Sequence, residues 1–193
     1  LDVPGEALPK VSHWYREGAP YFQQRVLVVG GGNSAVEAAL DLCRNGARVS
    51  LAHFESQLDS GIKPWILPEV TGRIEKGEIE TWFCCRVASI DETTVTLRNG
   101  ETGATHRIDN DFVFAMTGWT PDAPLLRALG VSIDPETAVP THDPASFETD
   151  VPGVHVAGVL VTGSNKTFIE NGRMHGGMIV RALKATADGI GRR

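Results

Sequence analysis

The chain has little cysteine, few aromatic side chains and no long apolar run. Three cysteines occur among its 193 residues, and none forms a CxxC pair, so the composition predicts neither a disulfide framework nor an internal dithiol and fits a reducing compartment. No stretch approaches the roughly 20 apolar residues of a membrane span, and the first residues lack the basic and apolar regions of a signal peptide. We therefore expect a cytoplasmic protein with no membrane partner.

Positive charge is also scarce. Eighteen Lys and Arg residues stand against 24 Asp and Glu residues, and no basic run is long enough to follow a phosphate backbone, so nucleic acid is not an expected partner. No Cys/His cluster has the spacing of metal ligands, so the sequence predicts no metal site. Glycine, by contrast, is plentiful. The chain has 21 glycines among 193 residues, about 11%, and an average chain has about 7%.

The clearest pattern is a strand, turn, helix and second strand. Residues 25–29 form a continuous apolar run, typical of a strand buried on both faces of a parallel sheet. Three glycines at 30–32 end this strand, and a helix is predicted from Asn33. Its apolar residues lie at helical spacing, at 36, 39, 40 and 43, and the Asn-Gly pair at 45–46 ends it. Residues 49–53 alternate as the second strand, which completes a βαβ unit.

Other segments carry weaker signals. A helix is predicted from Lys63, with Pro64 in its first turn, to Gly77. Four β-rich segments are predicted to cover one side of the sheet: 79–83, 86–91, 93–98 and 105–108. A buried strand (111–116), a short helix (123–129), a short buried strand (154–158) and a long helix (168–187) follow. Gly172, Gly176 and Gly177 within that last helix predict close backbone packing.

These elements predict an α/β fold, a Rossmann-like three-layer FAD/NAD(P)-binding domain with a parallel central sheet and a β-meander layer. We expect three parts. Residues 1–24 are interpreted as a lead-in or hinge, residues 25–121 as an NAD(P)-binding domain and residues 122–193 as the C-terminal portion of an FAD-binding domain.

The glycine turn carries the strongest functional signal, because Gly30, Gly32 and Ala35 match G-x-G-x-x-G/A in the strand-to-helix context that this motif requires. Gly30 would permit the tight turn, Gly32 would let the backbone approach a diphosphate, and Ala35 would let the helix lie close to the strand. The helix N-terminus offers free N–H groups and a partial positive charge, which adds Gly31, Asn33 and Ser34 to the predicted contacts. The alternative is a purely structural glycine turn in another α/β fold.

The end of the second strand should distinguish NAD from NADP, since an acid there binds ribose hydroxyls and a basic group binds a 2′-phosphate. His53 stands at the usual acid position, and Phe54 and Glu55 follow it. Lys63, ten residues further on, could reach a 2′-phosphate. The residues alone leave the choice of nucleotide open.

Four stretches together carry a family resemblance. The stretch at 30–39 resembles the nicotinamide-nucleotide domain of thioredoxin reductase-like flavoproteins. With 62–68, 112–118 and 168–173 it is similar to the bacillithiol disulfide reductases of the YpdA type, and the likeness spans nearly the whole chain.

The resemblance implies a cofactor relay. In that family an NADPH domain is inserted into an FAD domain, and electrons pass from NADPH through FAD to a low-molecular-weight disulfide. It implies that this chain is a fragment whose partner is an FAD module of the same protein, and that hydride moves between cofactors without a catalytic side chain. The surface left exposed by the missing module should be apolar, so we also expect a homo-oligomer.

The resemblance also assigns residues outside the glycine turn. Gly158 and Val159 would touch FAD through backbone atoms, and Thr117 and Gly118 would lie at the ligand edge of the sheet. Cys84 and Cys85 are expected to be ordinary thiols. Two other functions stay open: a non-catalytic NAD(P)H-sensing module, and a flavoenzyme of the ferredoxin reductase or monooxygenase type.

Overall fold

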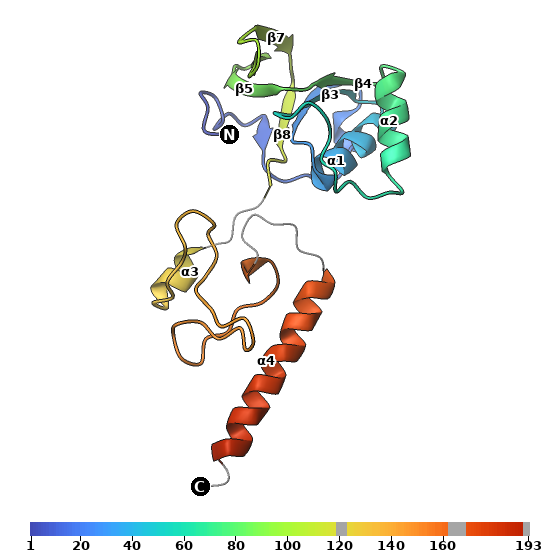
Figure 1. The fold of residues 1–193 in the computed structure, drawn as a ribbon. Helices are drawn as coiled ribbons and strands as arrows, with labels where there is room; N and C mark the ends of the chain where they lie inside the picture. Colours follow the sequence, from blue (N-terminus) through green and yellow to red (C-terminus); the bar gives the residue numbers. More distant parts are fainter. Residues whose placement is uncertain (119–122, 162–168, 191–193) are drawn as a thin grey trace. The chain divides into compact units, whose positions relative to one another are not determined.

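The computed structural model describes residues 1–118, 123–161 and 169–190 (Figure 1). It divides the chain into two compact units, Leu1–Gly118 and Trp119–Arg193, and each is described here by itself. None of the helices in the described ranges is long and apolar enough to cross a membrane.

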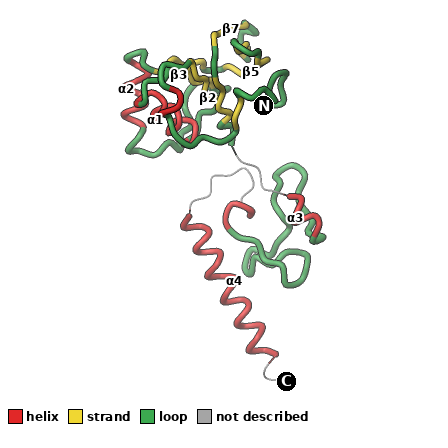
Figure 2. The backbone as a smooth tube through the Cα atoms, turned by 180° about the vertical axis from the view of Figure 1, so that it is seen from behind, coloured by secondary structure: helices red, strands yellow, loops and turns green. Residues whose placement is uncertain are grey.

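The first unit is built on a five-stranded parallel sheet with the order β1-β8-β2-β3-β4. Helices α1 and α2 pack on one face of this sheet, and a three-stranded antiparallel sheet, β5-β6-β7, packs on the other (Figure 2). The elements are β1 (Val11–Ser12), β2 (Arg25–Val29), α1 (Asn33–Arg44), β3 (Arg48–Ala52), α2 (Leu67–Glu75), β4 (Ile79–Trp82), β5 (Cys85–Ile90), β6 (Thr94–Asn99), β7 (Thr105–Asp109) and β8 (Phe112–Ala115). The three-layer α/β prediction is confirmed.

Strand β2 separates the two cores of this unit. Val26 and Val28 belong to the core beneath the helices, whereas Leu27 and Val29 belong to the core beneath the antiparallel sheet. Successive side chains of a strand point to opposite faces, so a strand that is covered on both sides must be apolar throughout. Burial on both faces therefore explains the continuous apolar run at residues 25–29.

One predicted covering strand lies elsewhere. Segment 79–83 supplies β4, which pairs in parallel with β3 and extends the main sheet, so its prediction as part of the covering layer was wrong. Helix α2 connects β3 to β4 as a crossover, which permits parallel pairing, whereas β5, β6 and β7 follow one another through short antiparallel connections.

Helix α2 begins at Leu67, four residues after the predicted start at Lys63. A hydrogen-bonded turn occupies the intervening residues, where the N–H of Ile66 donates to the carbonyl of Lys63 at 3.0 Å. Pro68 then occupies the first helical turn, where the N–H that proline lacks would have no helical partner.

The segment interpreted as a lead-in contributes to the fold. Val11 pairs with Val113 of β8, which makes β1 the edge of the sheet, and Leu1, Val3 and Leu8 pack against the second core. Residues 1–24 therefore pack as part of the first unit. Only two residues pair, which is too few for a visible sequence period.

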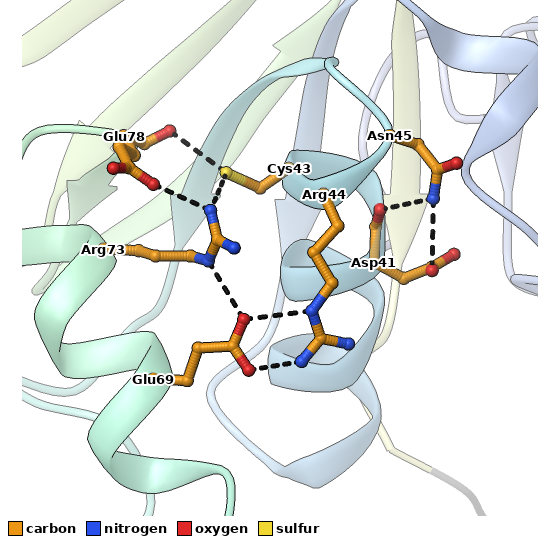
Figure 3. A network of polar contacts seen from close by, with 7 residues as sticks. All are labelled: Asp41, Cys43, Arg44, Asn45, Glu69, Arg73 and Glu78. Atoms are coloured by element: carbon orange, nitrogen blue, oxygen red, sulfur yellow. Dashed lines mark hydrogen bonds and ion pairs between the residues drawn. The ribbon is translucent and has the colours of Figure 1, made fainter.

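Helices α1 and α2 are joined by a polar network (Figure 3). Arg44 forms an ion pair with Glu69, and the Arg73 guanidinium lies 3.1 Å from the Glu69 carboxylate and 2.7 Å from that of Glu78. The same guanidinium donates to Cys43 Sγ at 3.4 Å. Each exposed ion pair contributes little by itself, so the network chiefly fixes how the two helices pack and gives Cys43 a structural contact.

The second unit contains α3 (Ala123–Ala128), the 3-10 helix η2 (Gly158–Val161) and α4 (Ile169–Ile190). Leu126, Val131 and Val156 form its small core. The predicted domain boundary at 121–122 and the first residue of the predicted long helix, 168, lie outside the described residues.

Two predictions for this unit were wrong. Segment 154–158 is not a strand, because among the described residues His155 makes only an isolated bridge to Glu148 and η2 begins at Gly158. A strand needs a neighbouring ladder, and the described residues offer this segment none. Close packing holds for Gly172, whose added Cβ would lie 3.7 Å from the Cα of Gly158, but no described atom lies within 4 Å of a Cβ at Gly176 or Gly177.

Asp111 fixes the junction of β2 and β8. Its carboxylate accepts hydrogen bonds from the Arg25 backbone N–H at 2.8 Å and from the guanidinium at 2.6 Å. These bonds from Arg25 lower the pKa of Asp111 to about 2, from an ordinary value of 3.8. Because the pKa is lower in the folded state, the stabilisation is complete above the ordinary value and disappears as the pH falls toward 2.

We expect Asp111→Asn to lower the free energy of unfolding at pH 7 by about 1 kcal/mol, less than the full pKa shift implies, because the carboxylate is partly exposed. Urea unfolding at pH 7 and pH 3 measures this, and the difference from wild type should shrink at pH 3. Asp109→Asn is the control, because Asp109 pairs with the same guanidinium but is 74% exposed. Equal effects of the two substitutions would contradict this role of Asp111.

Candidate nucleotide-binding site

The turn between β2 and α1 can be made only by glycine at its first position. Gly30 has φ = +136°, and a Cβ added there would lie 2.4 Å from the carbonyl oxygen of Met116 and 3.2 Å from the Cβ of Ala35. A side chain at Gly30 would therefore be both strained and blocked. Ala35 is fully buried, so the small residue at the third motif position lets α1 lie close to the strand.

The first turn of α1 presents unpaired backbone donors. Gly32 is the N-cap and has no side chain to cap the helix, and the first helical bond runs from the Val36 N–H to the Gly32 carbonyl at 3.0 Å. Within the described ranges, no hydrogen bond engages the N–H groups of Gly31, Gly32 or Ser34. Unpaired amides at a helix N-terminus form a site for an anion such as a diphosphate.

His53 lies against this turn, directly after β3. Its ring is 3% exposed and fills the space above Gly31, where an added Cβ would lie 2.4 Å from Nε2 and from Cδ2. The sequence predicted that His53 would lie near the bound nucleotide. The structure brings it to the glycine turn and shows that the absence of a side chain at Gly31 makes room for the imidazole.

Asp59 is a site residue that the sequence reasoning missed. Its N–H donates to the Gly31 carbonyl at 3.0 Å, and its Oδ2 would lie 3.1 Å from a Cβ at Gly32. A carboxylate beside the turn can accept hydrogen bonds from ribose hydroxyls, the role normally filled by an acid at the position of His53. Asp59 lies in a loop six residues beyond that position, so motif spacing could not have found it.

Asn33 and Lys63 hold this loop against α1. The Asn33 side chain donates to the Gly61 carbonyl and accepts from the Lys63 N–H, both at 2.8 Å. Lys63 Nζ lies 2.5 Å from the Glu37 carboxylate, so its charge is paired with an acid of α1. Its contact with a 2′-phosphate stays a prediction.

Arg86 is a second residue that the sequence reasoning missed. The Phe54 ring lies 4.7 Å from the His53 ring, and the guanidinium carbon of Arg86 lies 4.5 Å from the Phe54 ring centre. Backbone bonds from Cys84 to Glu55 and from Cys85 to His53 tie the start of β5 to this segment. The pairing of β5 with residues far earlier in the chain brings Arg86 there, and no local motif signals it.

The remaining predicted contacts are divided between the two units. Thr117 and Gly118 follow β8, and Gly118 has φ = +106°. In the second unit Gly158 has φ = +67°, and its N–H donates to Nδ1 of the buried His175 at 3.1 Å. This amide is therefore already engaged, whereas Val159 is 43% exposed.

The cysteines have no redox arrangement of their own. All three are free, and desolvation, helped by the neighbouring Glu101, raises the pKa of the Cys84 thiol. A thiol with a raised pKa is a poor nucleophile, which agrees with the expectation that Cys84 is an ordinary thiol.

Comparison with known proteins decides the family. The family model for pyridine nucleotide-disulphide oxidoreductases matches residues 1–158. The chain belongs to this family. The resemblance drawn from the four sequence stretches is thereby confirmed.

Individual relatives agree with this family assignment. It is 48% identical over 185 residues to the bacilliredoxin reductase Bdr of Bacillus subtilis, covering 95% of this chain and 57% of that protein. It matches the solved bacillithiol disulfide reductase Bdr (YpdA) of Bacillus cereus with a TM-score of 0.90 and 43% identity, covering 96% of this chain and 57% of that one. The chain therefore spans little more than half the length of these relatives.

A more distant oxidoreductase shows the fold alone. Thioredoxin reductase of Lactococcus lactis matches with a TM-score of 0.80 at 24% identity, covering 97% of this chain and 62% of that one. The predicted Rossmann-like class is confirmed by this likeness.

The contact between Gly31 and His53 predicts that substitutions at these two positions are coupled. Gly31→Ala should lower the free energy of unfolding by about 1–3 kcal/mol, because the new methyl group meets the imidazole. In a His53→Ala background the same change should cost at least about 1 kcal/mol less. Urea unfolding of the four proteins measures the coupling.

Gly72→Ala is the matched control, because no described atom outside its chain neighbours and its own helix backbone lies within 4 Å of a Cβ at Gly72. In the interior of α2 this change should be neutral or stabilising by up to about 1 kcal/mol. Strict additivity of the Gly31 and His53 substitutions would show that the ring does not occupy the space above Gly31.

Proposed function

We propose that this chain is the NADPH-binding portion, with part of the FAD-binding domain, of a flavin-dependent disulfide reductase. The intact enzyme would pass hydride from NADPH to FAD and reducing equivalents on to a low-molecular-weight disulfide of the bacillithiol type. The observation that supports this most directly is the glycine turn, whose unpaired amides stand at the carboxyl edge of a parallel sheet. The names of the Bacillus relatives support the substrate class.

The residues of the first unit fit a dinucleotide. The amides of Gly31, Gly32, Asn33 and Ser34 would hold its diphosphate at the N-terminus of α1. The carboxylate of Asp59 would accept from a ribose. Because His53 and Asp59 lie against the turn, the nucleotide would contact both of them while its diphosphate meets the amides.

The basic side chains support NADPH over NADH. Arg86 stands over Phe54, beside the carboxyl end of β3, where the ribose of the adenosine half is expected, and its guanidinium suits a 2′-phosphate. Lys63 can add a second charge only when it leaves Glu37, so Arg86 is the stronger candidate.

The redox chemistry belongs to the cofactors, since a nicotinamide supplies hydride and a flavin accepts it. The chain's own residues would bind and orient them and exclude water. Thr117 and Gly118 would lie at the nicotinamide-binding edge of the first unit, and Gly158 and Val159 would contact FAD, although the Gly158 amide already donates to His175. The functional division into 25–121 and 122–193 remains part of this proposal.

The partners of the chain also belong to the proposal. We propose that the chain works with an FAD module of the same protein, as a homo-oligomer and in the cytoplasm; the family likeness supports the FAD module. Met174, Val180 and Leu183 of α4 are each about half exposed, and apolar side chains of this kind suit burial against another surface.

Nucleotide titration of a Gly32 variant tests the proposed function. Gly32→Val would place methyl groups among the amides of the turn and should weaken NADPH binding at least tenfold. Its Cβ would meet only the mobile end of the Asp59 side chain, at 3.1 Å, so the fold should persist. Isothermal titration of the purified chain measures affinity, and circular dichroism measures folding.

Gly72→Val is the control for this experiment, because it adds the same side chain where no neighbour lies within 4 Å. It should bind NADPH as wild type does. Failure of the wild-type chain to bind either nicotinamide nucleotide, or equal binding by folded Gly32→Val, would overturn the proposal.

Arg86→Gln tests the choice of nucleotide. It should weaken NADPH binding about tenfold and leave NADH binding unchanged, because only NADPH carries the 2′-phosphate. Arg107→Gln is the control, since Arg107 lies on β7 of the same sheet and is 66% exposed. An equal loss for both nucleotides would show that Arg86 does not read the 2′-phosphate.

A further inference from the structure

Three side chains that can bind metals meet in the loop after β3. His53, Glu55 and Asp59 each present a ligand atom, and these atoms all lie within 4.8 Å of one another. The sequence predicts no metal site, because it contains no Cys/His cluster with the usual spacing. An acidic pair with a single histidine has no such signature, and the fold of the loop brings the three together.

The histidine is the observation that points to a ligand. His53 is 97% buried, since its exposed fraction is 3%, and neither ring nitrogen has a hydrogen-bond partner among the described residues. A buried polar group without a partner costs free energy. A metal ion on the nitrogen that faces Asp59 would give that nitrogen a partner, because neutral imidazole is a common metal ligand.

The distance between His53 and Asp59 fits coordination better than hydrogen bonding. Nε2 of His53 lies 3.4 Å from Oδ1 of Asp59, which exceeds the usual range of about 2.7–3.2 Å for a hydrogen bond. Metal–ligand bonds of about 2.1 Å place neighbouring ligand atoms of a tetrahedron about 3.4 Å apart. Glu55 is exposed and can move the short distance needed to complete the set.

The backbone holds the three residues in place. The N–H of His53 donates to the Trp82 carbonyl at 3.0 Å, the Glu55 carbonyl accepts from Cys84 at 2.8 Å, and the N–H of Asp59 donates to Gly31 at 3.0 Å. Strand ends and the glycine turn thus fix both ends of the short loop. A ligand set held in this way loses little conformational freedom when an ion binds.

We propose that His53, Glu55 and Asp59 bind a divalent transition-metal ion of the Zn²⁺ class. One imidazole with two carboxylates gives three protein ligands and leaves a fourth position for water, which is the number of ligands in an open zinc site. The imidazole disfavours Mg²⁺ and Ca²⁺, which take oxygen ligands. The proposal is independent of the proposed function, because the site is complete without a nucleotide.

Titration of the nucleotide-free chain tests the site. Zn²⁺ should bind with a stoichiometry of one in isothermal titration calorimetry, and Mg²⁺ under the same conditions should not bind. Co²⁺ should give visible absorption bands with the intensity of a four-coordinate site. Asp59→Asn and His53→Gln should each weaken Zn²⁺ binding at least tenfold, and Glu55→Gln should weaken it less.

His13→Gln is the matched control, because His13 Nε2 also lies near a carboxylate, 3.2 Å from Glu6, but on the surface, where the His13 side chain is 51% exposed. It should leave the affinity unchanged. Circular dichroism checks that the variants fold, and Asp59→Asn decides the result if His53→Gln does not fold. Absence of Zn²⁺ binding, or binding that Asp59→Asn leaves intact, would overturn the proposal and show His53 and Asp59 to be an ion pair only.

Discussion

The contact between Gly30 and the carbonyl oxygen of Met116 constrains the functional edge of the first unit. Strands β2 and β8 run side by side in parallel, with Val29 opposite Ala115, so the chain leaving β2 must turn beside the end of β8. Only a residue without a side chain can pass at this distance with a positive φ. Helix α1 consequently begins at the carboxyl edge of the sheet, and the N–H groups of Gly31, Gly32 and Ser34 at its start have no hydrogen-bond partner among the described residues.

Several segments supply side chains to that edge. His53 arrives at the end of β3, Asp59 comes from the loop that Asn33 holds against α1, and Arg86 comes from β5. In parallel sheets the carboxyl ends of neighbouring strands meet at one edge, which is why ligands bind there. The same loop accounts for both proposals, since its amide contacts with the turn also hold the candidate metal ligands together.

The cysteines fit a protein that relies on bound cofactors. Cys43 contacts the Arg73 guanidinium within the α1–α2 network (Figure 3), and the pKa of Cys84 is raised. In a family of disulfide oxidoreductases this leaves binding and orientation as the chain's proposed contribution. In the second unit, the buried His175 ring stacks on Phe147 and accepts a hydrogen bond from the Gly158 N–H. These contacts hold the backbone in place at the proposed FAD contact.

The sequence by itself determined β2, the glycine turn, α1, β8 and α4, because an apolar run, a glycine that must take positive φ and a helical period are local signals. It also placed His53 beside the turn, through its position after a strand. The tertiary structure alone decided that 79–83 joins the main sheet, that β1 forms its edge, that 154–158 is not a strand, and that Asp59 and Arg86 reach the site. Each of these depends on pairing between distant segments, and the energy of such pairing is absent from any short stretch of sequence.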